Sequence, residues 1–439
     1  MSEPGGVIER LSTTPLGRRL VSWTGAMRSR IGRNALVYGA DFALRIAVQL
    51  GYFLVISRAL GAGGYGAFVS LTALTFLASA FAGLGAEQVL IRRVARDGSS
   101  HGDALGNALA ATVLSWVVVV PLAVGLVALL NVGGLQAAVV LPVVVADVML
   151  LRFVTLANAC FQAREEGRPQ LVLNVASSAL RLGAAGLAWW LTPDLDLAVW
   201  ALWYVGAAGL SALVAVGMVL RRLGPPQAAF HPADMRDGTI YALEFASMAA
   251  VRDLDKPVVA ETLGAEAAGV YAAAFRIVDT ACVPVRALLR ATYTRYFRHG
   301  REGTAATLGF ARRVLGPMAA VSLAVALGLA VMAPVVPWLI GEDYARSVPI
   351  IRWLALYPLL LGLSAMGADV LRSLGRQRAR VVVMLVSVAL YVPLVWWGAR
   401  AFGPEGAALA RTASQFLLFA VTALVVARVS RDGATSGGP

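Results

Sequence analysis

The stretch LVYGADFALRIAVQLGYFLVISRALGAGGYG, residues 36–66, joins an apolar run to a glycine-rich segment. Its end, Gly61–Gly66, matches the G-x-G-x-x-G pattern of dinucleotide-binding folds, and an acid, Glu87, follows about twenty residues later. In such folds the glycines follow a short β-strand, whereas the apolar run here covers residues 35–57. That length suits a membrane-spanning helix. The pattern therefore indicates a tight turn between two membrane helices, where glycine permits positive φ and close backbone approach.

The composition of the whole chain agrees with a membrane protein. Of 439 residues, 59% are hydrophobic and 14% are charged, and the mean hydropathy is +0.72. Soluble domains are about 45–50% apolar and about 25% charged, so the polar surface is too small to coat a body of this size in water. We therefore predict an all-α polytopic membrane protein. Twelve apolar runs are each long enough to span a bilayer: about 35–57, 67–90, 104–130, 135–160, 169–191, 197–220, 238–260, 267–294, 314–339, 347–370, 379–399 and 406–427.

The basic residues predict the orientation of these spans. Arginine accounts for 37 of the 38 basic residues, and 25 arginines fall in the termini and every second connection, all on one side of the membrane. The other connections hold only Arg58, Arg346 and Arg400. Because cytoplasmic loops collect Lys and Arg, we expect both termini to be cytoplasmic. The net charge of +13 is then a topology signal, and nucleic acid is not an expected partner.

Neither the cysteines nor the histidines form a recognisable site. Cys160 and Cys282 lie in apolar runs, which predicts buried thiols without a disulfide, and the three histidines fall in polar connections. Metal-ligand spacings such as H-E-x-x-H or C-x-x-C do not occur, so we predict no metal site, no cofactor and no catalytic residues. Residues 1–34 carry six arginines without a short apolar core and cleavage site, which favours a basic tail over a signal peptide.

An internal repeat appears when the sequence is shifted by 203 residues. The stretch YGADFA (38–43) then meets YALEFA (241–246), and Gly61 and Gly66 meet Gly264 and Gly269. Six spans in each half give two halves of the same orientation, which is a parallel repeat about an axis along the membrane normal. The predicted organisation follows the chain in this order: basic cytoplasmic tail 1–34, N-lobe 35–221, cytoplasmic linker 222–237, C-lobe 238–428 and cytoplasmic tail 429–439.

Charged residues inside the spans are the candidate functional residues. Each charge costs about 2.5–3.5 kcal/mol at a helix centre on insertion scales, so these residues must face a wet cavity or each other. Arginine suits phosphate oxygens, and a basic cavity favours an anionic substrate such as a lipid pyrophosphate. Arg276 either pairs with Asp279 or lines the cavity, and Arg411, near a span end, is interpreted as an anchor. The acids either pair with arginines or couple transport to protons or sodium ions.

Several motifs resemble a known family. They are SRALGAGGYGAFVSL (57–71), GLGAEQVLIRRVAR (83–96), DKPVVAETLGAEAAGVYAAAFRI (255–277), GEDYARSVPIIRWLA (341–355) and AFGPEGAALARTASQ (401–415). In order and spacing they resemble the polysaccharide-transporter branch of the multidrug/oligosaccharidyl-lipid/polysaccharide (MOP) flippase superfamily, of the O-antigen or exopolysaccharide flippase type.

The resemblance implies a fold and an activity. The fold is a V-shaped pair of six-helix lobes around a central cavity. The activity is alternating-access transfer of a polyprenyl-pyrophosphate-linked oligosaccharide from the inner to the outer leaflet of the bacterial inner membrane. Expected partners are that substrate, membrane lipids, a coupling H⁺ or Na⁺, and the glycosyltransferase or polymerase machinery of polysaccharide synthesis. Substrate-binding candidates are Arg45, Arg252, Lys256, Arg276 and Arg286, and ion-coupling candidates are Asp41, Glu244, Asp255 and Asp279.

Two alternatives to a polysaccharide flippase remain open. A drug or cation antiporter of the same superfamily should have an acidic and aromatic cavity, yet the spans hold ten basic residues against seven acids. A membrane enzyme acting on lipid-linked sugars would need a catalytic loop or domain on the external side. The external connections have about a dozen residues or fewer, so the chain is not expected to be an enzyme.

Overall fold

The computed structural model describes residues 30–130, 134–192 and 194–435. Side chains are described except those of residues 30–43, 45, 377–381, 384, 388 and 432–435, so the predicted roles of Asp41 and Arg45 lie outside the described side chains. Most of the predicted basic tail lies outside the described residues as well.

The described residues are almost entirely helical and contain no strand. In chain order the helices are α3 (Arg30–Ser79), α4 (Ala86–Ala95), α5 (His101–Leu129), α6 (Ala137–Val144), η2 (Val145–Leu150), α7 (Leu151–Ala163), α8 (Gly167–Leu191), α9 (Leu197–Leu223), α10 (Pro232–Asp253), α11 (Asp255–Leu263), α12 (Ala265–Ala281), α13 (Val283–Arg301), α14 (Thr304–Met332), α15 (Val335–Ile340), η3 (Glu342–Tyr344), α16 (Ser347–Leu354), α17 (Tyr357–Ser373) and α18 (Gln377–Thr435).

These helices account for the twelve predicted spans. By length and hydropathy, eight helical stretches of the described chain could cross a membrane. Two of them, within α3 and α18, contain a sharp kink and so make two spans each, with non-helical dihedrals at Gly61 and at Phe402–Gly403. The two spans that complete the count of twelve are broken helices with charged residues inside them. One is α10 with α11, and the other is α12 with α13.

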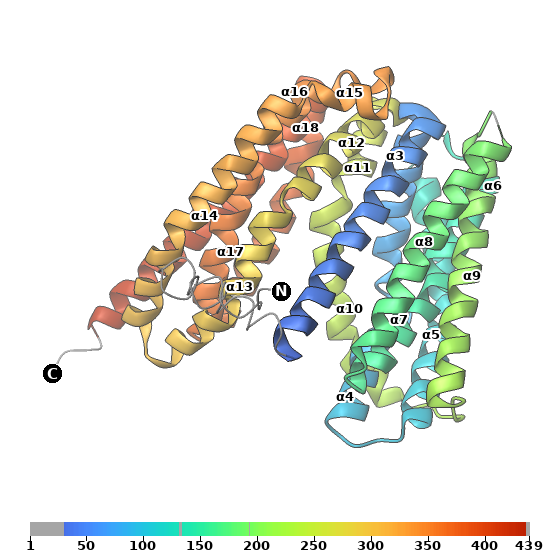
Figure 1. Ribbon diagram of the computed structural model, residues 1–439, viewed down its shortest axis with the longest axis horizontal. Coiled ribbons are helices and arrows are strands. Elements are labelled where there is room, and N and C mark those ends of the chain that lie inside the picture. The colour runs from blue at the N-terminus through green and yellow to red at the C-terminus, as the bar shows by residue number, and fades with distance from the viewer. Residues whose placement is uncertain (1–29, 131–133, 193, 436–439) are drawn as a thin grey trace, which may run out of the picture.

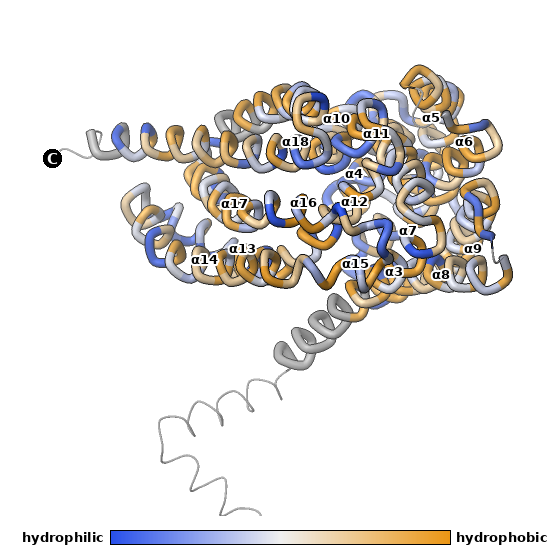
Figure 2. Tube along the Cα trace, turned by 90° about the horizontal axis from the view of Figure 1, so that it is seen from above, coloured by the Kyte–Doolittle hydropathy of each residue, from blue (hydrophilic) through white to orange (hydrophobic). Residues whose placement is uncertain are grey.

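The spans form two lobes that converge at one end and diverge at the other (Figure 1). The N-lobe contains α3 to α9 and the C-lobe contains α10 to α18. Helices α3, α12, α15 and α16 meet at the converging end, whereas α14 and α17 on one side and α7 and α9 on the other separate towards the diverging end. Apolar residues dominate the peripheral helices, while hydrophilic residues interrupt α10, α11 and α12 (Figure 2). The predicted all-α, two-lobed, V-shaped fold is confirmed.

The glycine repeat marks equivalent turns in the two lobes. Gly61 has φ 62° and ψ −179° at the kink of α3, and Gly264 has φ 89° and ψ 167° between α11 and α12. Positive φ strains any residue that has a Cβ atom, which explains glycine at both positions. The predicted turn over Gly61–Gly66 is therefore a single residue, since positions 62–66 already belong to the following helix. The span after it is also shorter than expected and ends at Ser79.

A glycine crossing holds the lobes together near the converging end. A Cβ atom on Gly66 would lie 1.9 Å from the backbone oxygen of Ala265, and one on Gly269 would lie 1.9 Å from the backbone oxygen of Ala62. The helices can approach this closely only because both positions lack a side chain. The two glycines that the repeat pairs in sequence thus contact each other in space.

We expect Gly269→Ala to destabilise the protein by about 1–3 kcal/mol, the usual cost of overpacking a tight contact. The backbone of Ala62 cannot turn away from the new methyl group as a flexible side chain could. Thermal unfolding in detergent measures the loss. Gly183→Ala is the matched control, because nothing lies within 4 Å of a Cβ atom at that position of α8. Equal unfolding temperatures for the two variants would contradict the crossing.

At the diverging end, ion pairs hold the first turns of α10 against the N-lobe. Arg93 of α4 pairs with Asp234 of α10 and with Asp103 of α5, both at 2.9 Å. Arg92 pairs with Asp237 of α10 at 2.9 Å, and this hydrogen bond holds the pKa of Arg92 above its usual value. We call these ion pairs the α10 clasp. They bind a C-lobe helix to N-lobe helices.

The clasp is reinforced by backbone contact and ends where α10 breaks. A Cβ atom on Gly238 would lie 2.0 Å from the backbone oxygen of Leu84. Further along, α10 ends at Asp253 and α11 begins at Asp255, with Leu254 at the break. The two halves of this span share α3 and α18 as neighbours, but α10 also contacts α4 whereas α11 also packs on α12.

Candidate functional site

The break between α10 and α11 places a cluster of charges inside the C-lobe. Lys256 donates to Asp253 Oδ1 (2.7 Å), Asp255 Oδ1 (3.2 Å) and the Arg252 carbonyl oxygen (3.0 Å). Asp255 also pairs with Arg411 of α18 and accepts a hydrogen bond from the Tyr271 hydroxyl at 2.7 Å. We call Asp253, Asp255, Lys256 and Arg411 the C-lobe ion cluster. It joins α11, α12 and α18.

The position of Arg411 corrects the expectation of a membrane-interface anchor. Its side chain is 5% exposed, and its guanidinium lies 3.5 Å from the ring centroid of Phe275. It also donates to the Tyr391 hydroxyl at 2.6 Å. A buried charge is stabilised by such a partner of opposite charge. Sequence gave no sign of it, because Asp255 and Arg411 lie 156 residues apart.

Arg276 does not belong to the C-lobe ion cluster. It is half-buried on α12, seven residues after the glycine crossing, and lies within electrostatic range of Tyr52 and Tyr65 of α3. Within the described part of the chain, no carboxylate lies within 4.0 Å of its guanidinium nitrogens. Asp279, the partner proposed from spacing, pairs with Arg286 instead. Arg276 thus lies at the contact between the lobes with its hydrogen-bond donors available.

Two more of the predicted cations lie near the breaks in their spans. The side chain of Arg252 is 65% exposed, pairs with Asp253 at 2.9 Å and lies 5.5 Å from the ring centroid of Phe76 in the opposite lobe. Arg286 of α13 is 38% exposed in its pair with Asp279 of α12. We call Arg252, Arg276 and Arg286 the interlobe cations. Lys256, predicted with them, is 7% exposed and belongs to the C-lobe ion cluster.

The predicted ion-coupling acids fall in different surroundings. Asp255 is buried in the ion cluster and Asp279 is half-buried in its pair with Arg286. Glu244 is exposed on α10. Within the described residues, no group of three or more His, Cys, Asp or Glu side chains could hold a metal ion.

A buried acid in the N-lobe was not among the candidates. Asp147 of η2 is 8% exposed, accepts a hydrogen bond from the Tyr204 hydroxyl at 2.6 Å and is hydrogen-bonded to Thr75. Its neighbour in sequence, Arg152, pairs with Glu87 of α4 at 2.6 Å. The partners of Asp147 come from α3 and α9, so no spacing along its own span could have revealed them.

A half-open apolar pocket lies between the lobes. It has a volume of about 510 Å³ and lies between α3 of the N-lobe and α12, α14, α15 and α16 of the C-lobe. Its lining includes Leu50 and Leu54 from α3, and Ile277 and Thr280 from α12. Ile277 follows Arg276 on α12, so the apolar pocket and the cation share one helix.

Two lobes of six spans that meet in a glycine crossing, with cations at the contact, define a two-lobed membrane protein with many spans. The chain belongs to the polysaccharide biosynthesis protein family, whose model matches residues 31–293. A search of curated proteins gives no match.

Solved structures show the same fold. A multidrug resistance MATE family transporter of the MOP superfamily in its inward-facing conformation has a TM-score of 0.70 at 15% identity, over 91% of this chain and 96% of that one. Lipid II flippase MurJ in an inward closed conformation has a TM-score of 0.71 at 10% identity, over 91% of each chain. An outward-facing MATE transporter has a TM-score of only 0.58 at 14% identity, over 89% and 94%. Each of these similarities concerns the fold.

Proposed function

We propose that the protein is a flippase that moves a polyprenyl-pyrophosphate-linked oligosaccharide from the cytoplasmic to the external leaflet by alternating access. The observation that carries the proposal is Arg276, a half-buried guanidinium at the lobe contact without a carboxylate partner among the described residues. A guanidinium with free donors matches phosphate oxygens in a bidentate manner.

The neighbouring groups suit an amphipathic anion. Arg252 and Arg286 are both solvent-accessible, and each already shares its charge with one acid. A pyrophosphate that approaches Arg276 would compete for these pairs, while the lipid chain would contact apolar surface such as the 510 Å³ pocket. A site of this kind holds an anion with a hydrocarbon tail better than it holds a cationic drug.

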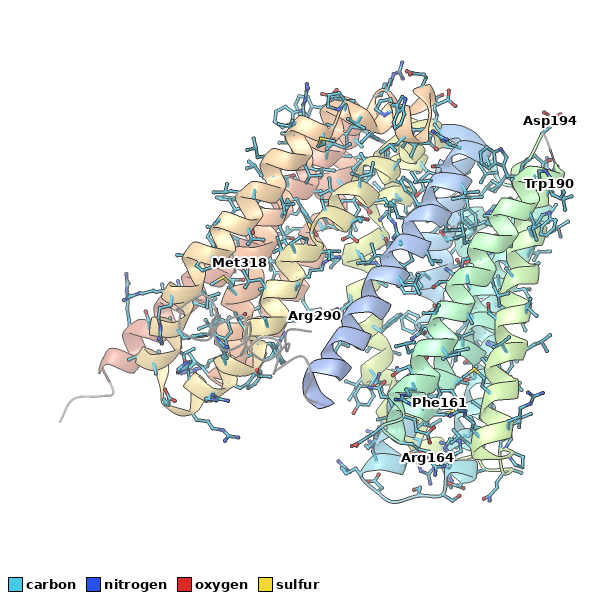
Figure 3. All side chains as sticks on the ribbon, in the orientation of Figure 1. Phe161, Arg164, Trp190, Asp194, Arg290 and Met318 are labelled. Atoms are coloured by element: carbon cyan, nitrogen blue, oxygen red, sulfur yellow. The ribbon has the colours of Figure 1, made fainter. Side chains whose placement is uncertain are left out.

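The proposed orientation places the diverging end in the cytoplasm of the bacterial cell, with the protein in the inner membrane. Arg164, from an arginine-bearing connection, lies at the diverging end, whereas Asp194 lies at the converging end (Figure 3). The positive-inside rule favours this placement, which also puts both termini in the cytoplasm. Lipid-linked sugars assembled by cytoplasmic glycosyltransferases would then reach the site first, before any external polymerase.

Ion coupling through Asp41, Glu244 or Asp279 remains a prediction. For Asp255 the contacts favour a structural role, because Arg411 and Lys256 already neutralise it and Tyr271 occupies one of its oxygens. A carboxylate held this firmly is poorly suited to exchange ions during a transport cycle.

A leaflet-resolved assay tests the proposal. Purified protein is reconstituted into vesicles with a fluorescent polyprenyl-pyrophosphate oligosaccharide, and a membrane-impermeant quencher reports the leaflet that the sugar occupies. We expect the protein to speed equilibration of the sugar between leaflets. Vesicles that instead accumulate a cationic dye, and leave the sugar in place, would favour the drug-antiporter alternative. Release of free sugar would favour an enzyme.

A further inference from the structure

The N-lobe contains a buried carboxylate that the interlobe cations do not explain. Asp147 lies in η2, where the wide π-helical turn leaves the Val148 carbonyl to accept a hydrogen bond from the Trp116 indole at 3.0 Å. Single π-helical turns within α-helices are frequent at functional sites. Among the described residues, no basic nitrogen lies within 4.0 Å of Asp147. An ionised carboxylate buried without a cation is costly.

The hydrogen bonds around Asp147 have room for one extra proton. The Thr75 hydroxyl has one hydrogen but two acceptors, the Thr72 carbonyl oxygen at 3.2 Å and Asp147 Oδ2. If Thr75 donates to Thr72, the contact with Oδ2 requires a hydrogen on Asp147. If Asp147 is ionised, Thr75 donates to it instead, and Tyr204 donates to Oδ1 in both cases. Both states satisfy every side-chain group without moving a helix.

The charged surroundings make the two states different. Arg181 of α8 acts electrostatically on Asp147 but forms no ion pair with any described residue. An ionised Asp147 attracts this guanidinium, and a protonated one does not. Helix α6 has no titratable residue, and those of α5, His101 and Asp103, stand at its start. Among the described side chains, the other groups nearby are Tyr52 and Tyr65 from α3, Arg152 from α7 paired with Glu87, Arg181 from α8, and Tyr204 from α9.

We propose that Asp147 is a proton-binding site of the N-lobe, and that gain and loss of its proton couple lobe movement to a proton gradient. The proton comes from water and returns to it, and no other bond is made or broken. Asp147 joins α3, η2 and α9, so a change in its pull on Arg181 acts on four spans at once. The coupling part rests on the proposed flippase function, whereas proton binding does not.

Infrared difference spectroscopy of the full chain in lipid vesicles tests proton binding directly. We expect a carboxylic-acid C=O band that titrates with pH and is absent from Asp147→Asn. In Tyr204→Phe the carboxylate loses a donor, so the titration midpoint should move to higher pH by about one to two pH units. Ser211→Ala is the matched control, since this buried hydroxyl of α9 donates only to the Ala207 carbonyl oxygen at 2.8 Å. An unchanged band in Asp147→Asn would overturn the proton site.

Transport under a pH gradient tests the coupling. Wild-type protein should flip the lipid-linked sugar at least about tenfold faster with a gradient than without one, and Asp147→Asn should keep only the rate without a gradient. Equal wild-type rates with and without the gradient would overturn the coupling, and so would an Asp147→Asn variant that still responds to the gradient. If wild-type protein shows the titrating band but moves no lipid-linked sugar, the flippase proposal fails while the proton site stands.

Discussion

Replacing Arg276 by alanine should reduce transport of the lipid-linked sugar at least about tenfold while the protein remains folded. The reason is that a hydrogen bond between charged groups contributes about 1.5–3 kcal/mol, and Arg276 makes no such bond to a described residue in the absence of substrate. Removing it therefore costs binding energy without unpairing an acid. Arg276→Lys should recover part of the rate, since it keeps the charge but loses the planar fork.

The readouts are surface polysaccharide in cells and the leaflet-resolved assay in vesicles. Arg312→Ala is the matched control, since this arginine is exposed on α14. We expect it to transport normally, and we expect all variants to unfold at nearly the wild-type temperature. Normal transport by a variant with Arg252, Arg276 and Arg286 all neutralised would rule out a cationic substrate site.

Replacing Arg411 by alanine should have the largest effect on stability. Breaking a buried ion pair by removing one partner costs about 3–5 kcal/mol, and Asp255 would keep only Lys256 and the Tyr271 hydroxyl. Thermal unfolding in detergent measures the loss. Arg400→Ala is the control, because its guanidinium contacts the ring of Trp396 on an exposed surface, where such a contact contributes about 0.5–1 kcal/mol.

A double variant separates the ion pair from general damage to the core. Asp255→Asn in the Arg411→Ala background removes the uncompensated charge, so it should be more stable than the sum of the two single losses predicts. Strict additivity would show that Asp255 and Arg411 do not interact energetically.

The fold could be predicted because its signals, the length of apolar runs and a repeated motif, can be read directly from the sequence. Apolar length predicted the spans, and one constant offset predicted the equivalence of Gly61 with Gly264 and of Gly66 with Gly269. The side-chain pairing could not be predicted, because it depends on distant spans. Asp279 had two arginines within reach along its own sequence and pairs with the farther one, Arg286, across the break at Cys282.

The candidate site residues divide in the same way. A half-buried arginine in mid-span was a candidate from sequence, and Arg276 is found at the lobe contact. Asp147 was visible as an intramembrane acid, yet its meaning depends on Thr75 and Tyr204, which lie 72 and 57 residues away. For Arg411 the sequence was misleading. Its position near a span end suggested an anchor at the membrane–water interface, whereas its side chain is buried in the protein interior.

The α10 clasp has a mechanical consequence. One end of this span is fastened to α4 and α5 of the N-lobe, and its continuation α11 is fastened to α18 by the C-lobe ion cluster. The span formed by α10 and α11 is thus attached by ion pairs to both lobes. If the lobes rock, the break at Leu254 is where this span can bend, and its two attachments limit how far the lobes can separate at the diverging end.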